Sequence, residues 1–157
     1  MGQQLLATLS NMINLHEELM SLGESKKDAL IERNVNSLSE VMKAERELLQ
    51  ALSVEEEKRQ ELVEELGGTG QTLKEVLTKL SPAVRRIIES RAVTLKQKAE
   101  ALQVLNEQND VLLKDAMAFV HHMIGHLTAS PEQPLTYTRP NQKPASSTPR
   151  GYFDTKA

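Results

Sequence analysis

Residues 81–128, SPAVRRIIESRAVTLKQKAEALQVLNEQNDVLLKDAMAFVHHMIGHLT, decide the fold of this chain. Ser81 followed by Pro82 is typical of a helix start, because serine caps free N–H groups and proline fits the first helical position. No further proline occurs until Pro131. The stretch therefore predicts one helix of roughly 45 residues, which is roughly 68 Å long at 1.5 Å per residue.

Apolar residues recur along this helix at alternating three- and four-residue steps, the spacing of a left-handed coiled-coil seam. A polar residue on such a seam sets the register between helices more often than it does chemistry, and we expect this role for Asn109. The predicted seam is Val84, Ile88, Arg91, Leu95, Lys98, Leu102, Leu105, Asn109, Leu112, Ala116, Phe119 and Met123.

Two long helices are predicted before this one, at about residues 3–33 and 37–66. Asn34 is expected to end the first in the left-handed conformation, and Ser37 with Glu40 is expected to open the second as a capping box. The first stripe is Leu5, Leu9, Met12, His16, Leu19, Gly23, Lys26 and Leu30. The second is Leu38, Val41, Glu45, Leu48, Leu52, Glu55, Arg59, Leu62 and Leu66, with Met42, Leu49 and Val63 beside it.

The charged residues Glu45, Glu55 and Arg59 predict a weak or hydrated middle for the second seam. The glycine-rich turn at 67–70 ends this helix, and a short helix is expected at about 72–80. Together these segments predict an all-α fold for residues 1–128, an elongated antiparallel three-helix bundle or coiled coil.

Residues 129–157 differ in composition and are predicted to form a flexible tail rich in proline and serine. Four basic residues stand there against two acidic ones, so the helical part is more acidic than the net charge of −3 for the whole chain. Tyr137, Tyr152 and Phe153 lie in this tail, although the chain has only two tyrosines and two phenylalanines. Aromatic residues in such a segment indicate short linear motifs that contact a partner.

Composition argues against several functional classes. The chain is 26% charged with mixed signs and lacks a basic patch, so nucleic acid is not an expected partner. It has no cysteine, which fits a cytoplasmic location, and no apolar run of membrane-spanning length or signal peptide. No catalytic motif occurs, so we expect neither an enzyme nor a cofactor. His122 and His126 have the spacing of two metal ligands, but no third ligand lies near them and no metal is expected.

The segment AMAFVHHMIGHLTAS, residues 116–130, contains no Asp, Glu, Lys or Arg. Wound as a helix, residues 111–127 are apolar over about two-thirds of the circumference, whereas one bundle contact needs a stripe of little more than ~100°. A hairpin of two helices would be too short to cover the third helix beyond about Leu112. One interpretation is packing against the first helix or a homodimer contact; the other, which we favour, is a surface that binds a client protein.

Three stretches of the chain form a recognisable order. They are Glu45–Leu52 (ERELLQAL), Asn106–Leu113 (NEQNDVLL) before the charge-free segment, and the tail that ends in DTKA. In this order the chain resembles the FlgN-type flagellar export chaperones. The resemblance runs along nearly the whole chain. Proteins of this family are small cytoplasmic bacterial chaperones that hold the hook-associated proteins of the hook–filament junction before these pass through the flagellar type III secretion apparatus.

The resemblance implies that the C-terminal third binds amphipathic helical termini of two junction-protein clients. The client-binding residues would be Val111, Leu112, Leu113, Met117, Val120, Ile124 and Leu127. A tyrosine after the long helix would dock on the cytoplasmic domain of the export gate. Tyr137 occupies the matching position, and Tyr152 with Phe153 is the second candidate. The alternative function is a structural coiled-coil adaptor that uses the same apolar stripe for self-association.

Overall fold

The computed structural model describes residues 1–128, and within them it contains only helices. They are α1 (Gly2–Glu32), α2 (Val35–Gly67), α3 (Leu73–Leu77) and α4 (Pro82–Thr128). The expected all-α class and the single long third helix are confirmed. The expectations for Tyr137, Tyr152, Phe153 and the tail lie outside the described residues.

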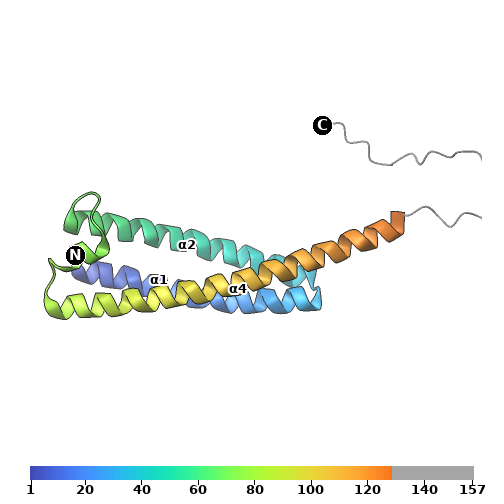
Figure 1. The fold of residues 1–157 in the computed structure, drawn as a ribbon, viewed down its shortest axis with the longest axis horizontal. Helices are drawn as coiled ribbons and strands as arrows, with labels where there is room; N and C mark the ends of the chain where they lie inside the picture. The colour runs from blue at the N-terminus through green and yellow to red at the C-terminus, as the bar shows by residue number, and fades with distance from the viewer. Residues whose placement is uncertain (129–157) are drawn as a thin grey trace, which may run out of the picture.

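Helix α1 lies between the two other long helices and packs against both α2 and α4. Figure 1 shows that α1 and α4 run in the same direction, with α2 antiparallel to them. The predicted stripe of α1 explains this central position, since every member except Lys26 is buried. On α2 the stripe is half-buried and Val63 is its buried neighbour, whereas Met42 and Leu49 are exposed.

The main core lies at the end of the molecule where α1 begins, α2 ends and α3 leads into α4 (Figure 1). Thr72 and Glu75 form a capping box that starts α3, with the Thr72 amide donating to Glu75 Oε2 at 2.7 Å. This short helix closes the end of the bundle. The buried core side chains are Leu5, Leu9, Val63, Val76, Leu77 and Ile88.

Polar residues on the α2 seam are paired, which accounts for their place in the bundle. Lys26 of α1 donates to Glu45 at 2.9 Å, and Asn11 of α1 donates to Glu55 at 3.3 Å. Further along α2, Arg59 forms a two-point ion pair with Glu56, at 2.7 Å from Nε and 2.6 Å from Nη2. The middle of the α1–α2 contact is therefore held by polar pairs as well as by apolar packing.

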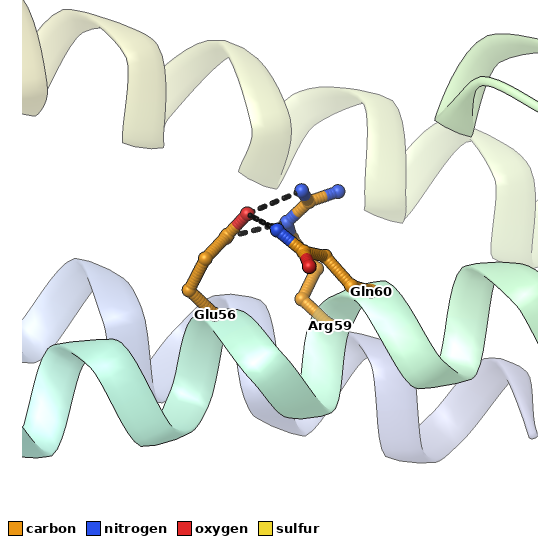
Figure 2. A network of polar contacts seen from close by, with 3 residues as sticks. All are labelled: Glu56, Arg59 and Gln60. Carbon is orange, nitrogen blue, oxygen red and sulfur yellow. Dashed lines mark hydrogen bonds and ion pairs between the residues drawn. The ribbon is translucent and has the colours of Figure 1, made fainter. Parts of the chain in front are cut away.

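Glu56 accepts hydrogen bonds from both Arg59 and Gln60 (Figure 2). In this view the Arg59 side chain rises from α2 toward the neighbouring helix instead of lying along the helix surface. The hydrogen bonds between these two side chains lower the pKa of the Glu56 carboxyl and raise the pKa of the Arg59 guanidinium. Both groups therefore remain charged at neutral pH.

The turn between α1 and α2 differs from the sequence prediction. Arg33, not Asn34, adopts the left-handed conformation, with φ 55° and ψ 36°. Asn34 is extended and caps α2, since its Oδ1 accepts from the Ser37 amide at 3.1 Å. Asparagine is suited both to capping a helix and to the left-handed conformation. Here Asn34 caps, and α2 therefore begins at Val35, two residues before Ser37.

Gly23 and Asn109 bring α1 and α4 into close contact. A Cβ atom on Gly23 would lie 2.5 Å from Cδ2 of Leu105, so only glycine permits this approach without a shift. Asn109 Nδ2 donates to the Gly23 carbonyl oxygen at 2.8 Å, while Asn109 Oδ1 is buried and has no hydrogen-bond partner within the described residues. The interhelical bond matches the register-setting role expected for Asn109.

Candidate protein-binding surface

The C-terminal part of α4 extends beyond the rest of the bundle (Figure 1). Asn109 is the last buried residue of this helix, and Leu112, Leu113 and Ala116 are half-buried. Every residue from Met117 to Thr128 is exposed. We call residues 117–128 the arm. Met117 is 54% exposed and Leu127 is 82% exposed, although both are apolar.

The arm is uncovered because the helices have unequal lengths. α4 has 47 residues, whereas α1 has 31, so α4 is about 24 Å longer at ~1.5 Å per residue. Both start near the same end of the molecule (Figure 1), and α1 ends beside the first turn of the arm, where Arg33 lies over Phe119. The hairpin was expected to cover α4 only to about Leu112. Burial does end before that residue, at Asn109, but partial cover by the hairpin continues to Phe119. An apolar surface of this kind usually marks a site of interaction with another molecule.

An apolar groove lies where the arm leaves the bundle. It is formed by the last turn of α1, the first turns of α2 and one face of α4, and its volume is about 420 Å³. This is within the usual size range of ligand pockets, roughly 300–1,000 Å³. The lining residues are Ala29, Leu30, Arg33, Asn34, Val35, Leu38, Leu113, Ala116, Met117, Phe119, Val120 and His121.

Arg33 connects the α1–α2 turn to the arm. Its guanidinium carbon lies 3.7 Å from the centre of the Phe119 ring, a stacked cation–π contact. The residues that line the groove include no Asp or Glu, and Arg33 is their only permanently charged member. Arg33 therefore brings the one permanent charge into the groove lining, and this charge is positive although the chain as a whole is acidic.

The seven residues expected to bind clients occupy three different environments. Leu113, Met117 and Val120 line the groove. Ile124 and Leu127 are exposed further along the arm, on the same helical face as these three by the 3.6-residue period. Leu112 is half-buried and Val111 is exposed, and neither lines the groove. Leu113, Met117, Val120, Ile124 and Leu127 thus form one row, which we call the arm row.

The α1–α2 side of the groove was not anticipated as part of the site. Leu30 lies in the last turn of α1, Arg33 in the turn that follows and Leu38 in the first turn of α2, and the fold brings all three to the groove. Leu30 and Leu38 were expected to serve the bundle stripes. In the sequence, Leu30 and Leu38 are recognisable only as apolar residues at the two helix ends on either side of the turn. This pattern does not show that α4 lies next to them.

The three arm histidines fall on different sides of the helix. His121 lines the groove, whereas His122 and His126 pair with each other, Nε2 to Nε2 at 3.1 Å, with their rings at 90°. Within residues 1–128, no three His, Cys, Asp or Glu side chains are arranged to hold a metal ion. In the same part of the chain, no helix combines the length and apolar character needed to cross a membrane.

Comparison with known proteins identifies the class. The model of the FlgN family ("FlgN protein") matches residues 1–145. The chain is also 27% identical to "Uncharacterized protein YvyG" of Bacillus subtilis (strain 168) over 121 residues, which is 76% of each protein. No solved structure matches the chain significantly.

The described part of the chain is a helical bundle in which a two-helix hairpin packs on one long helix whose apolar end is uncovered. The family match covers most of the chain, and the chain belongs to the FlgN family. Its general role is that of a flagellar export chaperone, as the resemblance in the sequence implied.

Proposed function

We propose that the protein is a cytoplasmic chaperone for the hook-associated proteins of the hook–filament junction, and that it delivers them to the flagellar type III export gate. The observation that carries the proposal is the arm row, because its side chains are apolar and all of them except the half-buried Leu113 are exposed. A client helix would bury its own apolar face on this row and could not assemble prematurely. Membership of the FlgN family supplies the flagellar context.

The apolar burial available on the arm is adequate for such a role. Burial contributes about 25 cal/mol per Å² of apolar surface, so several hundred Å² on the two partners would outweigh the association cost and give micromolar binding. Met117 and Met123 add flexible side chains to the exposed arm. Methionine repacks readily around different shapes, which favours a surface shared by two related clients.

Gate docking is assigned to the tail as a second contact. Tyr137 is the first candidate, and Tyr152 with Phe153 is the second. A tail motif linked to the bundle would hold the loaded chaperone near the gate at raised effective concentration. Replacing Tyr137 alone, or Tyr152 and Phe153 together, by alanine separates the candidates when binding to the purified cytoplasmic domain of the gate is measured.

The client-binding test uses Leu113→Glu, Val120→Glu and Ile124→Glu in one variant. We expect this variant to lose at least ~10-fold in affinity for the hook-associated proteins of the same organism, since three carboxylates would have to be desolvated in an apolar contact. The control is Val54→Glu, Val93→Glu and Val104→Glu, three residues elsewhere on the bundle that are as exposed as Val120 and Ile124. Because Leu113 is half-buried, circular dichroism of the arm variant must show that it remains folded. Equal binding by both variants would contradict the site.

The structural adaptor remains the alternative function, because an apolar row suits a second copy as well as a client. Light scattering of the wild-type protein and the arm variant distinguishes the two. Loss of self-association together with unchanged binding of every hook-associated protein would support the adaptor. An unchanged mass together with lost client binding would support the chaperone.

A further inference from the structure

We infer that the groove accepts an amphipathic helix whose apolar stripe is flanked by acidic side chains, and that Arg33 selects it. This inference rests on the proposed function and specifies the chemistry of the partner. The groove opens between helices, and its α4 wall belongs to a row with three- and four-residue steps. A helix that follows the arm row is the partner shape that this geometry fits.

The one permanent charge in the groove lining indicates the preferred flank of that helix. The lining contains Arg33 and no carboxylate, and within residues 1–128 no acidic side chain forms an ion pair with Arg33. The same part of the chain provides no hydrogen-bond acceptor for its guanidinium. The N–H groups of Arg33 are therefore available to a carboxylate on a bound helix.

The contact with Phe119 prepares Arg33 for this role. Stacking at 3.7 Å uses the face of the guanidinium, while its N–H donors point outward in the plane of the group. The side chain is thus held at the rim before a ligand arrives, which reduces the entropy lost on binding. Lysine has the same charge but cannot stack a planar group in this way.

The backbone of Arg33 is a separate observation in favour of a specific role. A left-handed residue at the end of a helix is most often glycine, because a side chain is strained at positive φ. Arg33 nevertheless occupies this position, with φ 55°. The position also means that Arg33→Gly removes the side chain while the backbone becomes easier to form, so this variant should fold at least as well as the wild type.

The test uses two labelled synthetic peptides of about 18 residues, long enough to form a helix on binding. Both carry the same leucine stripe at three- and four-residue steps, flanked by glutamate in one peptide and by lysine in the other. Fluorescence anisotropy with the full chain should give about 5-fold tighter binding of the glutamate peptide, the ratio expected for one partly exposed ion pair. This preference should shrink from about 0.05 to about 0.5 M NaCl.

Variants at Arg33 test the assignment. Arg33→Gly should lose the preference, Arg33→Glu should reverse it, and Arg33→Lys should retain only part of it. Arg86→Gln is the charge-matched control, because Arg86 is exposed near the start of α4, far from the groove, and its loss should leave the preference unchanged. Circular dichroism confirms that each variant remains folded.

The outcomes separate this inference from the proposed function. Equal affinity of the wild type for both peptides, or a preference that survives in Arg33→Gly, would overturn the role of Arg33 and leave the chaperone proposal standing. Binding of neither peptide at concentrations up to about 1 mM would overturn the groove as a helix receptor. Lost binding of hook-associated proteins by the arm variant, measured separately, would then still support the chaperone proposal.

Discussion

Asn109 combines an interhelical hydrogen bond with a buried oxygen that has no partner within the described residues. The bond from Nδ2 to the Gly23 carbonyl fixes the height of α4 against α1. The free Oδ1 has an energetic cost, because a buried acceptor without a donor loses its hydration. Asn109 therefore contributes more to the alignment of the helices than to their stability.

Two substitutions at Asn109 test this balance. Asn109→Asp should lower the free energy of unfolding by about 2–4 kcal/mol, because a carboxylate would be buried beside a carbonyl oxygen and lack the amide donor. Asn109→Leu should be at least as stable as the wild type, since it removes both the bond and the unpaired oxygen. Urea unfolding measures both changes. An unchanged midpoint for Asn109→Asp would contradict the buried contact.

The ion pair of Glu56 and Arg59 should make the stability of the fold depend on pH. The pKa of Glu56 is lowered in the folded protein, mainly by the hydrogen bond from Arg59, so its ionised form stabilises the fold. This contribution is present above the unfolded pKa of about 4.3 and is lost as the pH falls through the lower folded value. Because the pair is partly exposed, it should amount to no more than about 1 kcal/mol.

The measurement compares the wild type with Glu56→Gln. At pH 7 the variant should unfold at a slightly lower urea concentration, and the difference should shrink to near zero well below pH ~4. Glu57→Gln is the control on the neighbouring exposed residue, and it should show no such change. A difference that persists undiminished in acid would exclude the ion pair as its cause.

At the scale of elements, α4 consists of a covered part and an uncovered part within one continuous helix. Amide exchange depends on local opening, and tertiary cover is what prevents the ends of a helix from opening. Residues 117–128 should therefore exchange much faster than residues 85–109, as measured by hydrogen–deuterium exchange with mass spectrometry. A bound client should slow exchange in the arm and leave exchange in the covered part almost unchanged.

Equal protection along the whole of α4 in the free protein would contradict this view of the arm. It would indicate that another surface already covers the apolar row. The dimeric alternative makes that prediction, and dilution then provides the discriminating control: exchange in the arm should accelerate as a dimer dissociates.

Helix positions were predictable because each long helix repeats its apolar residues regularly. The stripe of α1 was correct residue by residue, apart from the half-buried Lys26, which pairs with Glu45. The turn was less predictable, because Asn34 suits both a left-handed residue and an N-cap, and Arg33 has no local signal for positive φ. The groove was not predictable as a unit, since its two sides are separated by most of the sequence.

At the scale of the whole molecule, the main core and the apolar groove lie at opposite ends. The core of Leu5, Leu9, Val63, Val76, Leu77 and Ile88 lies where α3 closes the bundle. The groove lies at the α1–α2 turn, and the arm extends beyond it (Figure 1). The sequence predicted the uncovered arm from the unequal helix lengths, but the central place of α1 emerges only from the assembled fold.

The uncovered arm has a consequence for how this protein can change over generations. Residues 117–128 make no contribution to the buried core, so substitutions there alter the contact surface at little expense in fold stability. If the arm binds clients as proposed, selection on stability and selection on partner choice act on largely different codons. The contact surface could then change together with the client proteins while the scaffold remains unchanged.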